Sequence, residues 1–295
     1  MPRIDLHAHT TASDGSLTPE ELVRLAKSQG VSTLAVTDHD TIAGLSRAIA
    51  EGERVGVEII PGIEISCLYR QTELHILGYF INPADPRLEP ALAGYSASRE
   101  DRNPLIVRRL QELGCDVTYE EVKALAGSAT VGRPHIAQVL LRKGYVRSVS
   151  EAFDRYLADD SPAYVSRRLP PPEEAIGLIR QIGGIPVLAH PVYTSRLKDP
   201  FEQVCATLKG LGLMGLETFY SSHNRQQTDR YRSIAREQGL LVTGGSDFHG
   251  DAKPQLLVGT GYGNLEIPAD LLEPMRVLIK ERPSPWPSPR WGEGR

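Results

Sequence analysis

Asp5-Leu6-His7-Ala8-His9 is the stretch around which the rest of this sequence is organised. The short apolar run that leads into it predicts a β-strand, and alternate side chains of a strand point to the same side. His7 and His9 therefore face one side together. Two neutral imidazoles that point to one place are typical of a metal-ligand pair. The rest of the chain must then supply the other ligands of such a site.

The composition is that of an ordinary globular protein. The 295 residues, 40% hydrophobic and 24% charged, suffice for one large domain or one domain with an insertion. A net charge of −4 excludes a global basic field for long nucleic acid, but a few arginines could still bind a small phosphorylated substrate. No apolar run approaches the ~20 residues that a transmembrane helix needs, and the N-terminus lacks the order of a signal peptide.

The three cysteines, Cys67, Cys115 and Cys205, are odd in number and have no metal-binding spacing. This use of cysteine fits a reducing compartment, so we expect a cytoplasmic protein. Without thiolates, a metal would be bound by histidine and carboxylate. Such a ligand set favours Mn, with Fe or Zn as alternatives, in a catalytic site rather than a structural zinc.

Strands and helices alternate in the first and last parts of the chain. Strands are expected at 32–37, 57–65, 73–80, 185–191 and 213–218, and a final strand and loop at 240–249, with helices between most of them. This alternation favours a parallel sheet or barrel. Thr18 and Glu21 predict a capping box at the start of the first helix, and Gly30 its end.

Residues 83–168 break this alternation, because they show helical periodicity and almost no strand pattern. The block carries 13 Lys and Arg against 12 Asp and Glu, and is thus less acidic than the rest. We expect a small helical insertion that selects the substrate, inside a discontinuous barrel domain formed by 1–82 and 169–282. Residues 283–295 are rich in Pro, Ser, Trp and Gly, and are expected to be a disordered tail.

Histidines and an aspartate follow the C-terminal ends of four expected strands. Those residues are His7 with His9, His39, His190, and Asp247 with His249. In barrels of parallel strands, this end carries the active site. Glu64 and His75 lie on two further strands and could reach the same mouth.

Each of these residues also has a structural interpretation. A lone histidine on a strand is usually structural, and Asp14 alone would more often be a turn residue. Asp38 and Asp40 are interpreted as helix-capping residues rather than ligands. Glu64 is harder to dismiss, because a carboxylate within an apolar strand needs a partner or a metal. The His-x-His and Asp-x-His pairs favour a polynuclear metal site, because period-two spacing puts both members of each pair on one side.

Five motifs, in this order, resemble those of the PHP (polymerase and histidinol phosphatase) family. They are Asp5-Leu6-His7-Ala8-His9, Thr37-Asp38-His39-Asp40, Pro61-Gly62-Ile63-Glu64, Ala189-His190-Pro191 and Gly245-Ser246-Asp247-Phe248-His249. The resemblance implies an α/β fold, a distorted, TIM-like (β/α)7 barrel with two or three divalent metals at its mouth. The helical insertion and Arg133-Pro134-His135 are most similar to the subgroup of 3′,5′-nucleoside bisphosphate phosphatases and RNA 5′-end exonucleases.

The resemblance also implies nine metal ligands, which would form the catalytic centre. His7, His9, Glu64 and Asp247 would hold one metal. Glu64 would bridge to a second metal held also by His75 and His190, while Asp14, His39 and His249 would hold a third.

The implied reaction is hydrolysis of a phosphate ester by metal-activated hydroxide. We expect removal of the 3′-phosphate from a nucleoside 3′,5′-bisphosphate, such as adenosine 3′,5′-bisphosphate. Alternatives are a 5′-3′ exoribonuclease acting on short 5′-phosphorylated RNA, a histidinol-phosphate phosphatase, and an inactive metal-binding accessory module. No membrane and no obligate protein partner are expected.

Substrate contacts are expected mainly from the insertion. Arg99 and Arg102 are three apart, so they share a helical face and could fork onto a phosphate. Glu100 or Asp101 could accept a hydrogen bond from a base or ribose, although a solvated helix start is an equal interpretation. The full set of candidates is Asp14, His39, Arg99, Glu100, Asp101, Arg102, Arg133, Pro134, His135, His223 and Arg225.

Overall fold

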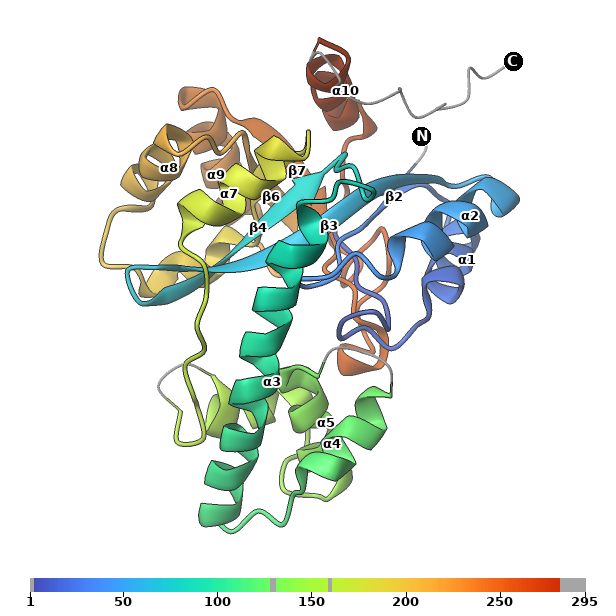
Figure 1. Cartoon of the computed structure of the whole chain (residues 1–295). Helices are drawn as coiled ribbons and strands as arrows, with labels where there is room; N and C mark the ends of the chain where they lie inside the picture. The colour runs from blue at the N-terminus through green and yellow to red at the C-terminus, as the bar shows by residue number, and fades with distance from the viewer. Residues whose placement is uncertain (1–2, 128–130, 159–160, 282–295) are drawn as a thin grey trace.

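Seven strands pair in chain order, each with the next, to form one curved sheet. The computed structural model describes residues 3–127, 131–158 and 161–281, so the expected disordered tail lies outside the described residues. The strands are β1 (Arg3–Asp5), β2 (Val31–Val36), β3 (Glu58–Tyr69), β4 (Thr72–Tyr79), β5 (Ile185–Leu188), β6 (Gly215–Tyr220) and β7 (Leu241–Gly245). They lie close to the predicted segments, and Figure 1 shows them at the centre of the larger part of the molecule.

The sheet closes on itself through the segments that follow β1 and β7. The Leu6 amide donates to the Gly244 carbonyl at 3.1 Å, and the Asp247 amide donates to the His7 carbonyl at 2.8 Å. A Cβ on Gly245 would lie 2.1 Å from the His7 Cβ, so only glycine allows this approach. The expected distorted barrel is confirmed, and it closes at the histidine pair.

β4 departs from the expected parallel arrangement, because it runs antiparallel to both β3 and β5. Only Arg70 and Gln71 separate β3 from β4, which is too short for a parallel crossover. Both residues have positive φ, 45° and 70°, as a tight hairpin turn requires. The hairpin carries Glu64 and His75 on adjacent strands.

Helices flank the barrel on its sides, and the last one in the chain lies at one end of it (Figure 1). They are α1 (Pro19–Ser28), α2 (Leu45–Val55), α7 (Pro172–Gln181), α8 (Phe201–Gly210), α9 (Arg225–Glu237) and α10 (Leu272–Glu281). The predicted capping box of α1 is confirmed, since the Thr18 hydroxyl accepts from the Glu21 amide and the Glu21 carboxylate from the Thr18 amide. α8 has no counterpart in the sequence prediction. None of the described helices is both long and apolar enough to cross a bilayer.

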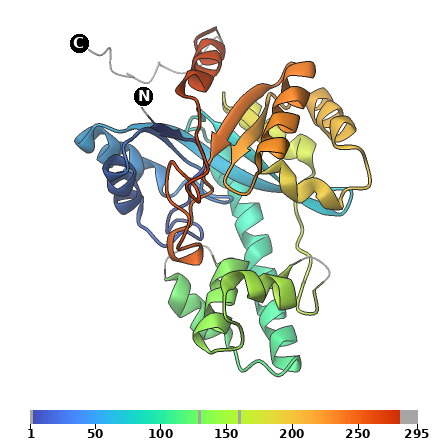
Figure 2. The ribbon, with the colours of Figure 1, turned by 180° about the vertical axis from the view of Figure 1, so that it is seen from behind.

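The predicted helical block extends away from the barrel, as Figures 1 and 2 show from opposite sides. It contains α3 (Leu88–Glu112), α4 (Tyr119–Ala126), α5 (Arg133–Arg142), α6 (Val149–Ala152) and a π-helical turn at Phe153–Leu157. Early α3 residues such as Leu92 pack in the barrel core, whereas Ile106 and Leu110 belong to a separate core of the block. α3 thus joins two cores, and the domain division at 83 and 168 stays a prediction.

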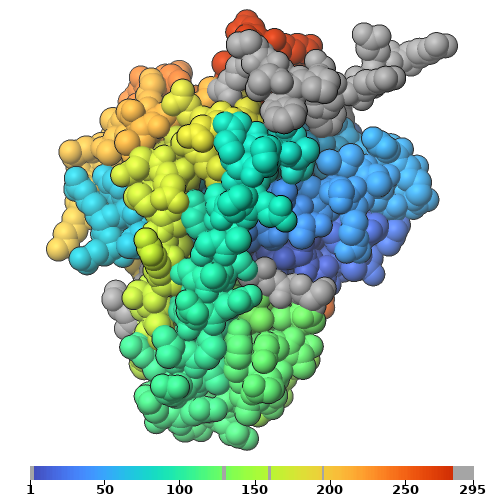
Figure 3. Space-filling view, in the orientation of Figure 1, coloured from blue at the N-terminus to red at the C-terminus, as the bar shows by residue number. Residues whose placement is uncertain are grey.

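The outgoing and returning connections of the block lie side by side. Figure 3 shows α3 next to the segment that precedes α7, and the Ser98 hydroxyl donates to the Arg168 carbonyl at 2.6 Å. This pairing braces the block against the barrel mouth.

The separate core of the block can be tested with two neighbouring leucines of α5. Leu140 is fully buried in that core, whereas Leu141 is 37% exposed. Leu140→Ala should lower the free energy of unfolding by about 2–5 kcal/mol, because it leaves a cavity. Leu141→Ala should cost less than about 1 kcal/mol. Urea denaturation measures both, and equal losses would contradict the packing described.

Candidate active site

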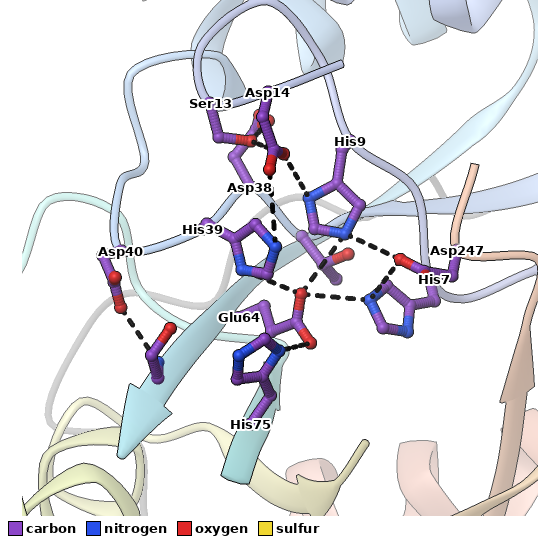
Figure 4. A network of polar contacts seen from close by, with 12 residues as sticks. His7, His9, Ser13, Asp14, Asp38, His39, Asp40, Glu64, His75 and Asp247 are labelled. Atoms are coloured by element: carbon purple, nitrogen blue, oxygen red, sulfur yellow. Dashed lines mark hydrogen bonds and ion pairs between the residues drawn. The ribbon is translucent and has the colours of Figure 1, made fainter. Parts of the chain in front are cut away.

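A fully buried carboxylate, Glu64 on β3, lies at the centre of a cluster of imidazoles (Figure 4). Five histidine rings reach its two oxygens from four other segments of the barrel. Oε2 is 3.2 Å from His7 Nε2, 3.3 Å from His9 Nε2 and 3.1 Å from His39 Nδ1, while Oε1 is 2.9 Å from both His75 Nδ1 and His190 Nε2.

Two aspartates and a sixth histidine complete the cluster. Asp247 Oδ1 lies 3.2 Å from His9 Nε2, and Asp14 Oδ1 lies 3.3 Å from His249 Nε2. Potential ligand atoms form three overlapping groups, each within 4.8 Å: His9, Asp14, His39 and His249; His7, His9, Glu64 and Asp247; and His39, Glu64 and His75. The structure thus brings together all nine residues expected from the sequence. Glu64, the expected bridging residue, belongs to two groups, and so do His9 and His39, so more ligands are shared between groups than the expected assignment gave.

Backbone strain directs two of these side chains into the mouth. His190 follows β5 with φ of 26°, and Asp247 follows β7 with φ of 58°. Left-handed backbone costs a non-glycine residue about 1–3 kcal/mol and persists where the surroundings enforce it. Here the surroundings include Glu217 of β6, whose carboxylate accepts from the His190 amide at 2.6 Å and contacts His7 Nδ1 at 2.9 Å.

Asp38 and Asp40 belong to none of the three groups, and the capping interpretation of them is wrong. The N-cap of α2 is Gly44. Asp38 instead accepts from the Thr10 amide at 2.7 Å and the Ser13 hydroxyl at 2.6 Å, so it fixes the loop that carries Asp14 (Figure 4). Asp40 accepts from Arg99 at 2.7 Å, which ties the helical block to the barrel.

The buried charges of the cluster favour the binding of metal cations. Burial raises the pKa of the Glu64 carboxyl, but the imidazoles of His39 and His7 outweigh this and hold it well below its usual range. Among the described residues, both ring nitrogens of His9 and Nδ1 of His39 are buried without a hydrogen-bond partner. Buried carboxylates beside unpartnered imidazoles fit divalent metal ions bound through nitrogen and oxygen.

The mouth opens into a cavity of about 240 Å³ between the barrel and the helical block. From the block and its return segment, Arg99, Arg102, Arg133 and Arg167 line this cavity, and Pro134 lies beside Arg133. From the barrel, it is lined by Asp14, His39, His75, His190, Asp247 and His249, together with Glu73, Tyr193 and Lys253.

Five of the predicted substrate contacts do not line this cavity. Glu100 and Asp101 point to solvent, because the same turn of α3 buries Arg99 and Arg102. His135 is buried and its Nδ1 accepts from the Gly132 amide, closing the N-terminus of α5. His223 packs against Tyr220 and Tyr231, with Nδ1 bonded to the Thr218 carbonyl. The Arg225 side chain is 97% exposed at the start of α9.

Sequence reasoning missed several residues of the site. Glu217 carries the same signal as Glu64, a carboxylate inside an apolar strand, and could have been found. Lys253 binds Asp247 Oδ2 at 2.7 Å, and Arg167 binds both Asp40 and Glu73 at 3.2 Å. Neither had a sequence signal, since isolated basic residues in loops are common on any surface.

Comparison with known proteins agrees with the motifs. A family model described as PHP domain matches residues 5–158. A 5′-3′ exoribonuclease of Haemophilus influenzae is 36% identical over 247 residues, covering 84% of this chain and 90% of the relative. A 3′,5′-nucleoside bisphosphate phosphatase of Chromobacterium violaceum is 32% identical over 250 residues, covering 84% and 88%.

The fold has a close counterpart among solved structures. A Bifidobacterium adolescentis protein assigned as a metal-dependent phosphoesterase superposes with a TM-score of 0.84 at 32% identity. The match covers 93% of this chain and 96% of that chain.

The shared position of His9 makes it the best test of the ligand set. His9→Ala should remove a large part of the tightly bound metal after loading with Mn, because two of the three groups lose a nitrogen. Elemental analysis of dialysed protein measures this. His223→Gln, at a buried histidine outside the cluster, is the matched control and should keep the full metal content. Unchanged metal in His9→Ala would overturn the ligand assignment.

Proposed function

This chain belongs to the PHP domain family and is related to its metal-dependent phosphoesterases, and from this premise we propose that it removes the 3′-phosphate of a nucleoside 3′,5′-bisphosphate. The nine-residue cluster is the proposed catalytic and metal-binding centre, with Mn as the favoured ion. The three cysteines are free and buried, which suits the proposed cytoplasmic location.

The observation that carries the proposal is the charge of the cavity wall opposite the cluster. Arg102 is 4% exposed and has no carboxylate within ion-pair distance among the described residues, its guanidinium bonding only to the Asn103 side-chain oxygen. Burial, together with Arg133, Arg99 and Arg167, lowers the pKa of Arg102 to about 9. A buried guanidinium that still carries its charge near pH 7 and has no acidic partner is a site for an anion.

The other three arginines are placed by carboxylates of the barrel. Arg99 and Arg167 contact Asp40, while Arg133 and Arg167 contact Glu73 at 3.2 Å. Their positive charge is therefore held in a fixed geometry around Arg102. Arginine forks of this kind recognise phosphate oxygens.

A substrate with two phosphates can place one at the histidine and carboxylate cluster and the other at the arginines on the opposite wall of the cavity. Divalent cations in such a cluster would lower the pKa of water and neutralise charge on phosphoryl oxygens. The chain holds the ester to be cleaved beside Glu64, and Arg102 binds the second phosphate. The cavity volume suits a mononucleotide better than a polymer.

A second candidate function is 5′-3′ exoribonuclease activity. The Haemophilus influenzae relative with that name is slightly more identical to this chain than the named bisphosphate phosphatase, at 36% against 32%. The 5′-terminal phosphate and next phosphodiester of an RNA present two anionic groups to the same two walls. The overall charge of −4 favours contact with the terminal nucleotides alone.

A substrate panel separates these functions. We expect purified, Mn-loaded protein to release phosphate from adenosine 3′,5′-bisphosphate and to leave AMP and histidinol phosphate nearly intact, since neither offers two phosphates. Phosphate release is measured alongside cleavage of a short 5′-phosphorylated oligoribonucleotide. If the bisphosphate were inert and the oligonucleotide were cleaved from its 5′ end, the exoribonuclease would replace the proposed function.

The role of Arg102 can be measured by its effect on KM. Loss of charge-assisted hydrogen bonds worth about 1.5–3 kcal/mol should raise KM for the bisphosphate roughly 10- to 100-fold in Arg102→Ala. The KM for p-nitrophenyl phosphate, which has one phosphate, should change little. Arg225→Ala is the matched control, because that side chain is solvent-exposed and outside the cavity. An equal rise for both substrates would remove the proposed phosphate contact.

A further inference from the structure

An aromatic ring stands exposed at the wall of an otherwise charged cavity. Tyr193 lines the cavity and is 54% exposed. It lies in a 3-10 helix (Pro191–Arg196) that directly follows β5 and His190. An exposed tyrosine contributes little to the hydrophobic core. Its position beside the histidine cluster is therefore better explained by contact with a bound ligand.

Two neighbouring rings hold the Tyr193 ring in place. It makes T-shaped contacts with the His190 ring at 5.2 Å and with the Tyr220 ring at 6.1 Å. The Tyr220 hydroxyl lies 2.8 Å from Asp247 Oδ2 and 3.4 Å from the Tyr193 hydroxyl. Because Tyr220 has one proton and gives it to the carboxylate, the Tyr193 hydroxyl donates to the Tyr220 oxygen. This chain of contacts fixes the ring relative to the cluster.

We propose that Tyr193 is the platform on which the base of the nucleotide stacks, and therefore a specificity-determining residue. The inference rests on the proposed function, since it assumes that a phosphate ester of a nucleoside is held at the cluster. A phosphate beside His190 places the attached ribose next to that ring, and the base beyond the ribose comes within reach of Tyr193.

The chemistry of this platform predicts what the site accepts. Every base has a π-face, so stacking on tyrosine tolerates all of them and discriminates by stacking strength. Purine nucleotides should therefore bind more tightly than pyrimidine nucleotides, without strict selection of one base. A ligand with both phosphates but no base should gain nothing from the ring.

Phe153 is the other aromatic residue of the cavity. Its ring is partly buried, and the Arg133 guanidinium lies 5.9 Å from the ring centre. A base at that position would compete with this cation–π contact. Tyr193 is the more exposed of the two rings, and Phe153→Leu tests the alternative.

The decisive experiment compares a nucleotide with its base-free counterpart. In Tyr193→Ala, kcat/KM for adenosine 3′,5′-bisphosphate should fall by about tenfold or more, and kcat/KM for the base-free sugar 3,5-bisphosphate by less than about twofold. Tyr193→Phe keeps the ring and should stay within about threefold of the parent on both. Tyr262→Ala, at a tyrosine 50% exposed outside the cavity, should change neither. Equal losses on the two substrates, or a selective loss only in Phe153→Leu, would overturn the inference.

A binding experiment keeps the inference testable if the proposed function fails. Parent protein that hydrolyses neither bisphosphate would refute the proposed function alone. The fluorescence of Tyr193→Trp then tests the stacking platform directly. The spectrum of the parent protein is subtracted to remove the emission of Trp286 and Trp291. AMP should quench the new tryptophan, and ribose 5-phosphate should not. Absence of quenching up to millimolar AMP, or equal quenching by both compounds, would refute the platform.

Discussion

The burial of one carboxylate constrains the whole barrel mouth. Glu64 is fully inaccessible to solvent, and moving an ionised carboxylate from water into such a place costs several kcal/mol unless partners surround it. Five imidazoles within 3.3 Å supply that compensation. They come from the ends of β1, β2 and β5 and from β4, so those elements must converge on one point. Closure of the sheet at His7 and Gly244 brings the last segment, with Asp247, to the same point.

The two parts of the molecule contribute opposite charges to the cavity. The barrel brings carboxylates and imidazoles, whereas the helical block brings arginines. Between them, Asp40 forms buried ion pairs with Arg99 and Arg167, and Glu73 forms partly buried ion pairs with Arg133 and Arg167. Breaking one partner of a buried pair is costly, so these contacts hold the block over the mouth. Of the four arginines that line the cavity, the anchor leaves Arg102 without an acidic partner among the described residues.

The sequence was most informative where chemistry and local geometry coincide. His7 with His9 and Asp247 with His249 could be paired because alternate positions of extended chain face one side. Glu217 could have been predicted on the same grounds as Glu64, because both carboxylates lie in apolar strands. The predicted parallel direction of β4 was wrong. Alternation of strands and helices predicts parallel strands, but β3 and β4 are joined by a two-residue turn and form an antiparallel hairpin. Arg99 and Arg102 lie on the cavity, while Glu100 and Asp101 between them do not.

The amino-acid sequence by itself indicated the barrel, the helical content of the block and most of the residues that cluster at the mouth, since residue type, period-two spacing and helical periodicity are local properties of the chain. Only the tertiary structure decided which basic and aromatic side chains face the mouth. The rotation of α3 about its axis is set by packing its two ends into two different cores, and that rotation buries Arg102. The position of Tyr193 likewise depends on rings from β6 and the end of β5. Such contacts join residues far apart in sequence, where no spacing rule applies. The histidine pair after β1 thus led from the sequence to the cluster. The cavity that the cluster faces is formed by packing between residues far apart in the sequence.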